Sequence, residues 1–177
     1  MLFRSRENLV GPLHGGWGVA KGLLKHERKL MSEIGVESAT RAYTAVECAK
    51  RYLPLAADGT VADAVMRDRL ARHEMQMHAI GLTQQRIMEE AKARAGTGLA
   101  ALVMKYCGTE EEKRRNELMV AMMGSQGLGW EGEGFDGAEL DTARGMLSTK
   151  ALSIAGGSSE IQLNIIAKRA LGLPGVI

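Results

Sequence analysis

The stretch Asp63–Arg94, DAVMRDRLARHEMQMHAIGLTQQRIMEEAKAR, decides the fold class, because its apolar side chains recur at steps of three and four residues. The repeating positions are Val65, Met66, Leu70, Met77, Ile80, Gln84, Ile87 and Met88. A run of this length without proline predicts one long amphipathic helix that buries a single stripe. Such a helix needs at least one helical neighbour.

The neighbouring segments supply such helices. A similar period over 17–53, ended by Pro54 and an Asp-Gly turn, predicts a long helix that packs antiparallel to the first. A third helix is expected from Leu99 to Met122. It passes through the charge run Glu110–Arg115, which is expected to form a solvated face.

Two shorter helices complete the pattern. One is expected over 137–152, after a glycine-rich loop, and the last begins at Ser158 and ends before Gly172 and Pro174. Ser158 is a natural N-cap, and Glu160 complements the helix dipole. Because no alternating apolar run suitable for a sheet separates the segments, we predict an all-α antiparallel bundle of four long helices and a short C-terminal helix.

Composition excludes several classes of function. The 177 residues carry a formal net charge of +2, which gives no reason to expect a nucleic-acid or membrane surface as partner. No run reaches the length of a membrane span, and the first residues lack the apolar core of a signal peptide. Cys48 and Cys107 are expected to be reduced, structural thiols in a cytoplasmic protein. The four histidines lack ligand spacing, so no metal is expected.

Three segments carry a resemblance to a known family. They are Glu7–Gly11 with Gly16–Arg28 (GWGVAKGLLKHER), the glycine-rich Met123–Gly129 (MGSQGLG), and Ser153–Pro174 (SIAGGSSEIQLNIIAKRALGLP). Together they resemble the C-terminal helical domain of the acyl-CoA dehydrogenases. This resemblance implies that 1–15 is a boundary segment from a β-domain and that 16–177 is the bundle.

The family architecture includes an N-terminal helical domain and a middle β-barrel domain that this chain does not encode. The resemblance therefore implies a fragment, a separate domain or a truncated gene product. A domain cut deliberately at its boundary is our first expectation, since domain boundaries lie in linkers that few contacts cross.

The resemblance also implies a catalytic site. In many relatives the catalytic glutamate lies in the closing loop at the position of Gly156, whereas others carry it on the first long helix, where Glu27 aligns. Glu27 is therefore the expected base, with a surface carboxylate as the alternative. Gly156 is expected to polarise the thioester carbonyl through its backbone N–H. Arg28 is expected to border the substrate channel, with an ion pair to Glu33 as the alternative.

Flavin contacts are implied at two places. Ser158 and Glu160 match one set, and Gln126, Gly127 and Gly129 match a set that relatives contribute from a neighbouring subunit. Helix capping by Ser158 and ordinary turns at the glycines are the alternatives. Relatives carry an Arg, a Phe-Gly pair and a Gln between the first two helices. Here Arg51–Gly59 departs from that pattern, so those contacts are not carried over.

The function implied is FAD-dependent α,β-dehydrogenation of an acyl-CoA thioester in fatty acid metabolism, with the isolated chain inactive. Expected partners are acyl-CoA, the missing domains, and further copies in a homodimer, homotetramer or mixed tetramer. A helical oligomerisation module, a related flavin oxidase and a catalytically silent subunit of a mixed flavoenzyme oligomer are the alternatives.

Overall fold

The computed structural model describes residues 6–24, 26, 43–93 and 99–174. The chain divides into two compact units, Met1–Ala42 and Tyr43–Ile177. In the first unit a short 3-10 turn, Arg6–Asn8, precedes a helix over 16–24. The domain boundary expected after residue 15 stays a prediction.

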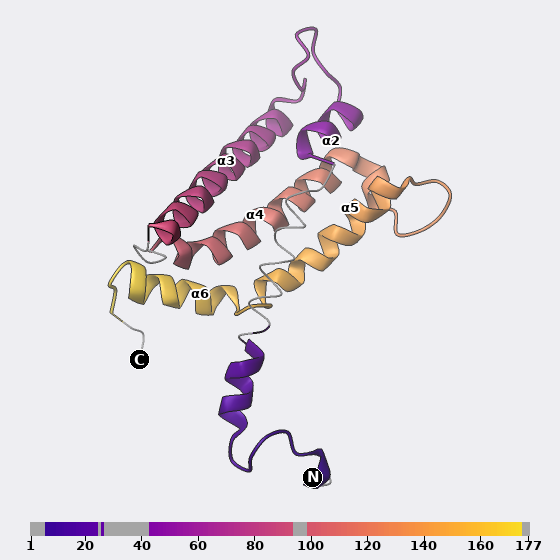
Figure 1. Cartoon of the computed structure of the whole chain (residues 1–177). Coiled ribbons are helices and arrows are strands. Elements are labelled where there is room, and N and C mark those ends of the chain that lie inside the picture. Colours follow the sequence, from indigo (N-terminus) through magenta and orange to yellow (C-terminus); the bar gives the residue numbers. More distant parts are fainter. Residues whose placement is uncertain (1–5, 25, 27–42, 94–98, 175–177) are drawn as a thin grey trace. The chain divides into compact units, whose positions relative to one another are not determined.

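The second unit is a helical bundle, which confirms the predicted all-α fold (Figure 1). Its helices are α2 (Ala45–Tyr52), α3 (Ala64–Lys92), α4 (Ala100–Met123), α5 (Gly137–Ser148) and α6 (Ser159–Ile165). Short turns of helix follow three of them: η2 (Gly124–Leu128), η3 (Thr149–Ser153) and the π-helical η4 (Ile166–Ala170). Among the described residues the only β-pairing is an isolated bridge between Leu55 and Val61.

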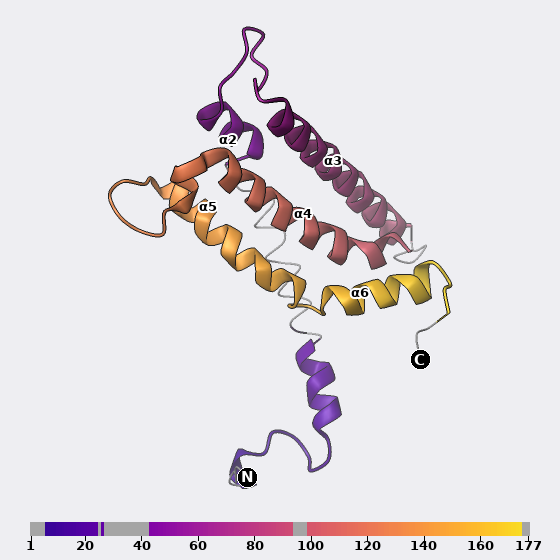
Figure 2. The same ribbon diagram turned by 180° about the vertical axis from the view of Figure 1, so that it is seen from behind.

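Helix α4 lies at the centre of the second unit. The helices α2, α3, α5 and α6 each pack against it, and α3 and α4 form an antiparallel pair (Figures 1 and 2). α2 sits at the end of this pair where α3 begins and α4 ends, and α5 runs along another side of α4. The bundle is therefore organised around one helix.

The continuous helix expected over 17–53 is interrupted, because Tyr43 and Thr44 are not helical. Thr44 is the N-cap of α2: its Oγ1 accepts a hydrogen bond from the Glu47 backbone N–H at 3.1 Å. The Glu47 carboxylate accepts one from the Thr44 backbone N–H at 2.8 Å. This reciprocal capping box stabilises a helix start at Ala45 and makes α2 short. Residues 27–42 lie outside the described part of the chain.

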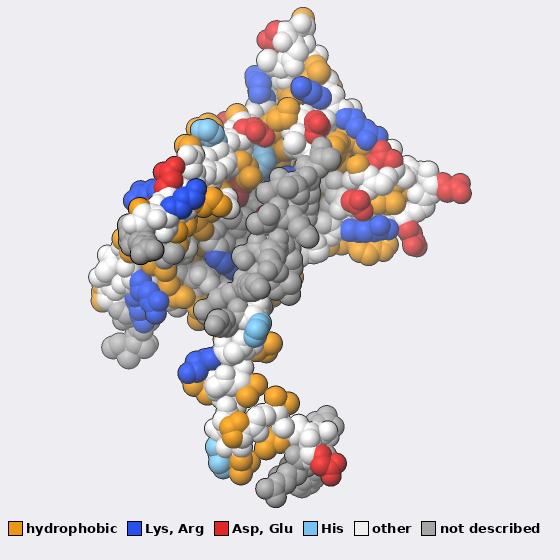
Figure 3. All heavy atoms as spheres, in the orientation of Figure 1, with side chains coloured by type: hydrophobic (Ala, Val, Ile, Leu, Met, Phe, Trp, Pro, Cys, Tyr) orange, Lys and Arg blue, Asp and Glu red, His pale blue; other side chains and the backbone are white. Residues whose placement is uncertain are grey.

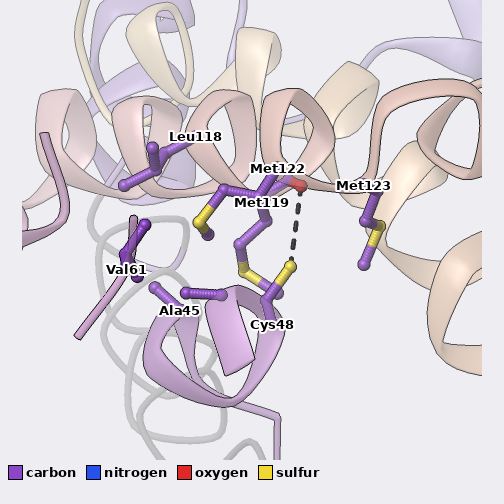
Figure 4. Close-up of a cluster of buried hydrophobic side chains, with 8 residues drawn as sticks. Ala45, Cys48, Val61, Leu118, Met119, Met122 and Met123 are labelled. Carbon is purple, nitrogen blue, oxygen red and sulfur yellow. Dashed lines mark hydrogen bonds between the residues drawn. The ribbon is translucent and has the colours of Figure 1, made fainter. Parts of the chain in front are cut away.

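The core joins α2 to the last turns of α4 (Figure 4). Its buried members are Ala45, Cys48, Ala49, Val61, Leu118, Met119, Met122 and Met123. The small α2 side chains let that helix approach α4, and the flexible methionines fill the space that remains. Cys48 Sγ lies 3.6 Å from the Met119 carbonyl oxygen, and burial raises the pKa of this thiol. Cys48 is therefore a structural thiol, as expected.

The predicted stripe of α3 is partly wrong. Met66, Leu70, Ile80 and Ile87 are half-buried, whereas Val65, Met77, Gln84 and Met88 are exposed. Among the described helices, α3 packs chiefly against α4, and this contact covers only a narrow side of it. The exposed apolar residues lie beside that narrow side.

The charge run Glu110–Arg115 is not a uniformly solvated face, because Glu111 is buried with a side chain only 3% exposed. Its Oε1 lies 2.6 Å from Nδ1 of His73, which is 7% exposed and comes from α3. Its Oε2 accepts a hydrogen bond from Arg114 Nη1 at 2.7 Å. The prediction of solvation is wrong at this position because α3 covers this side of α4.

The surface of the unit mixes charge signs. Lys, Arg, Asp and Glu side chains alternate with apolar ones on the face drawn in Figure 3. None of the helices in the described ranges combines the length and apolar content needed to cross a bilayer.

Candidate functional site

The closing loop between η3 and α6 carries Gly156, Ser158 and, in the first turn that follows, Glu160. Gly156 and Gly157 have φ values of +69° and +104°, which only glycine adopts without strain. A Cβ on Gly157 would lie 2.8 Å from Nε2 of Gln162, whose amide donates a hydrogen bond to the Gly156 carbonyl at 3.3 Å. The backbone conformation therefore favours glycine at both positions, and the close approach of Gln162 adds a packing reason at Gly157.

Ser158 caps α6 as expected. Its Oγ accepts a hydrogen bond from the Ile161 backbone N–H at 3.4 Å. The pKa of the exposed Glu160 carboxyl is lowered by its own backbone N–H and by the Ser158 hydroxyl. The capping role of Ser158 is thus present, and its hydroxyl also lies beside Glu160.

Lys105 of α4 connects the two ends of this loop. Its Nζ donates hydrogen bonds to the Leu152 carbonyl at 2.9 Å and to the Gly157 carbonyl at 2.7 Å. These charge-assisted bonds fix backbone on both sides of Gly156.

A second group of α4 side chains supports the same loop. Lys113 Nζ donates to Ser153 Oγ at 2.7 Å and to both carboxylate oxygens of Glu110 at 3.0 Å. Ser159 Oγ in turn donates to Glu110 Oε1 at 3.3 Å. Burial acts to raise the pKa of Glu110, but the Lys113 ammonium and the Ser159 hydroxyl outweigh it, and the net pKa is lowered. Glu110 is therefore a charged partner of Lys113.

The glycine-rich loop lies at the other end of α4. A Cβ on Gly127 would lie 2.7 Å from the Val120 carbonyl oxygen, and one on Gly129 would lie 2.5 Å from the Phe135 ring. Close packing therefore explains the glycine at both positions, independently of any contact with a flavin. The Oε1 atom of Gln126 is buried and has no hydrogen-bond partner in the described part of the chain. Buried acceptors of this kind usually have a partner.

The packing at Gly129 gives a testable expectation. Gly129→Ala should lower the free energy of unfolding by about 1–3 kcal/mol, because the added methyl group overlaps the Phe135 ring. Gly134→Ala is the matched control, since a Cβ there meets no atom within 4 Å. Urea unfolding of both variants checks this. Equal effects at the two positions would contradict the packing argument.

The two groups of expected flavin contacts are well separated along α4. Lys105, which holds the closing loop, and Gly124, which opens η2, lie at opposite ends of a helical segment roughly 28 Å long. This separation is compatible with the expectation that the two groups serve flavins in different subunits.

Glu27 and Arg28 lie outside the described residues. The structure therefore places Gly156, Ser158 and Glu160 at the closing loop and the first turn of α6, and Gln126, Gly127 and Gly129 at η2 and its C-cap. The expected base and substrate arginine stay predictions.

Sequence reasoning missed Lys105, Glu110 and Lys113. For Lys105 a signal was present, since it is the one charge within the otherwise apolar run Leu102–Cys107, where a lysine needs polar partners. Glu110 and Lys113 belong to the run of charged residues Glu110–Arg115, so nothing in the sequence distinguished them from their charged neighbours.

The segment Arg51–Gly59 departs from the family pattern, and its first side chains are engaged within the bundle. Arg51 pairs with Asp136, and the Tyr52 hydroxyl donates to Glu139 Oε1 at 2.7 Å. Burial and the Glu139 carboxylate raise the pKa of Tyr52. These contacts tie α2 to the start of α5.

An open depression of about 310 Å³ lies between α2, α3 and the segment that joins them. None of the expected site residues lines it. Across the described ranges, no three His, Cys, Asp or Glu side chains are grouped so that they could hold a metal ion.

The relatives found by comparison with known proteins are all named acyl-CoA dehydrogenases. The chain is 28% identical over 173 residues to acyl-CoA dehydrogenase FadE34 of Mycobacterium tuberculosis, covering 98% of this chain and 22% of that protein. It is 32% identical to acyl-CoA dehydrogenase IpdE1 of Mycolicibacterium smegmatis and 34% identical to IpdE1 of Mycobacterium tuberculosis. Both alignments cover 94% of this chain. They cover 39% of the Mycolicibacterium smegmatis protein and 40% of the Mycobacterium tuberculosis protein. No solved structure matches.

The chain thus spans well under half the length of these relatives. The family model of the acyl-CoA dehydrogenase C-terminal domain matches residues 14–171, nearly the whole chain. The chain therefore belongs to the acyl-CoA dehydrogenase family, as its C-terminal helical domain.

Proposed function

We propose that this chain is the C-terminal domain of an FAD-dependent enzyme that dehydrogenates an acyl-CoA thioester between its α and β carbons. The observation that carries the proposal is the closing loop, in which Lys105 of α4 binds the Leu152 and Gly157 carbonyls on either side of Gly156, beside the capped start of α6. Family membership over residues 14–171 supports the reaction class. The isolated chain is proposed to be inactive.

In the proposed reaction, the Glu27 carboxylate removes the α-proton of the thioester. A carboxylate with an ordinary pKa near ~4 is a weak base, so the site must bury it and position it against the proton. The Gly156 backbone N–H polarises the thioester carbonyl, a role that needs no side chain and that glycine keeps. Arg28 borders the substrate channel.

FAD, when bound, would accept the hydride from the β carbon. The buried, unpartnered Oε1 of Gln126 supports a contact at the glycine-rich loop, since it needs a donor that the described residues do not supply. Gly127 and Gly129 let this loop pack closely, and Ser158 and Glu160 stand at the second proposed contact. These residues are compatible with flavin binding but do not form a complete site.

Completion of the site requires other polypeptide. We propose that an N-terminal helical domain and a β-barrel domain supply most of the flavin site, and that further copies in a dimer or tetramer, or a mixed tetramer, supply the rest. Cytoplasmic localisation and a role in fatty acid metabolism belong to the same proposal.

Reconstitution tests the function. The chain purified together with polypeptide that carries the two other domains should bind flavin and reduce it when an acyl-CoA is added. The chain alone should purify without stoichiometric flavin absorbance. An assembled, flavin-loaded protein that oxidises no acyl-CoA would overturn the dehydrogenase assignment.

A second candidate is a helical oligomerisation module or a catalytically silent subunit of a mixed flavoenzyme oligomer. Two observations favour it: Gly156 lacks the carboxylate of many relatives, and apolar side chains on α3 and α6 are exposed. These include Met75, Leu82, Ile161 and Leu163. This candidate would be favoured by three results together: light scattering detects an assembly, the partner subunit binds the flavin, and the assembly does not dehydrogenate an acyl-CoA.

A further inference from the structure

We propose that Lys105 is a positioning residue for the dehydrogenation reaction, because its ammonium group fixes the loop that presents the Gly156 N–H. This inference rests on the proposed function and adds to it a residue outside the two expected sets of contacts. Lys105 itself need not touch the thioester.

The first argument is the geometry of the loop. Lys105 Nζ binds the Leu152 carbonyl on one side and the Gly157 carbonyl on the other, at 2.9 and 2.7 Å. Gly156 and Gly157 between them adopt left-handed conformations. Glycine has more conformational freedom than any other residue, so this backbone needs restraints from outside the loop.

The second argument compares the other restraints. Gln162 holds the Gly156 carbonyl at 3.3 Å, which is a long hydrogen bond from a neutral amide. Lys113 reaches the Ser153 hydroxyl, a side chain rather than the backbone. Among these three side chains only Lys105 combines a positive charge with contacts to backbone on both sides of Gly156. Its removal should therefore release the loop more than removal of either neighbour.

The third argument concerns the location of the charge. Lys105 lies in the apolar run Leu102–Cys107 and is half-buried. A buried ammonium group is unfavourable unless hydrogen bonds satisfy it, and the two carbonyls provide these bonds. The same contacts that stabilise the ammonium group restrain the loop.

A polarising N–H must lie at the carbonyl oxygen as charge develops there. A displacement of about 1 Å can lower a rate by about 100-fold. We therefore expect Lys105→Met to lower kcat by about 10- to 100-fold while KM for the acyl-CoA changes by less than about threefold.

The test uses the assembled flavoenzyme with Lys105→Met. Lys150→Met is the control, since Lys150 pairs with Glu117 and removal of that exposed pair leaves the loop contacts intact. The first readout is the split between kcat and KM. The second is the infrared stretching band of a bound thioester carrying a 13C-labelled carbonyl, which a hydrogen bond shifts to lower frequency. A merely structural role of Lys105 would not move this band.

We expect Lys105→Met to return the band toward the position of the free thioester and to lower kcat, with Lys150→Met resembling the wild type. If Lys105→Met does not fold, Lys105→Gln, which keeps an amide donor, is measured in the same way. An unchanged band and kcat in an active enzyme would overturn the positioning role and leave the proposed function intact. A wild-type assembly without any dehydrogenation would overturn the proposed function, and this role with it.

Discussion

Glu27→Gln is expected to lower kcat for acyl-CoA dehydrogenation by about 10²- to 10⁴-fold in the assembled flavoenzyme. Glutamine has nearly the same shape as glutamate but cannot accept the α-proton. Because the change removes a base and little else, flavin content and KM for the substrate should stay close to those of the wild type. Stopped-flow reduction of the flavin measures the chemical step directly.

The control for this experiment is Glu74→Gln, which removes an exposed carboxylate from α3, away from the proposed flavin and substrate contacts. It is expected to leave the rate of proton removal unchanged. If Glu27→Gln reduces flavin as fast as the wild type, Glu27 is not the base. In that case the carboxylate must come from another part of the assembly.

Glu111→Ala is expected to lower the free energy of unfolding by about 3–5 kcal/mol. The substitution leaves buried His73 without its 2.6 Å partner and opens a cavity between α3 and α4. Truncating one member of a buried pair is costly because the remaining polar group loses its partner without regaining water. Urea or thermal unfolding, followed by circular dichroism, measures the loss.

Glu117→Ala is the matched control, because Glu117 lies on the same helix and pairs with Lys150 at the surface. An exposed pair of this kind contributes less than about 1 kcal/mol. The double substitution His73→Leu with Glu111→Leu should lose less than Glu111→Ala alone, because it removes both polar groups from the interface. A loss below about 1 kcal/mol for Glu111→Ala would contradict the burial of this pair.

Local signals predicted much of the bundle correctly. The end of the chain is the clearest case: Ser158 caps α6, and Gly172 follows with a φ of +64°. These features depend on residues a few positions apart, so a short window of sequence contains their whole cause. The same holds for α5, which begins at the predicted residue, Gly137.

The predictions were wrong in two situations. In one, a second local signal competed with the apolar period, and in the other a residue's burial depended on a partner far away in the sequence. The segment Thr44-Ala-Val-Glu47 contains a capping box, but the continuing apolar period concealed the helix start. Glu111 is one heptad before the buried Leu118 and so shares its side of α4. Its burial depends on His73 from α3, which no local window of sequence reveals.

The same distinction between local and long-range causes applies to the residues of the candidate site. Ser158 could be located from the sequence because helix capping is a local property, whereas Gly156 was located through the resemblance to relatives. Lys105 carried a signal as the one charge in an apolar run, but its partners Leu152 and Gly157 are about 50 residues away along the chain, so no local window of sequence reveals them. Glu27 and Arg28 depend on the resemblance to relatives alone.

Because α2, α3, α5 and α6 each pack against α4, removing that helix would take away contacts of all four other described helices of this unit. We therefore expect partly folded forms of this unit to retain α4, which native-state hydrogen exchange would check. The loop that carries Gly156 takes two of its backbone hydrogen bonds from Lys105 of α4, so its shape depends on that helix being in place.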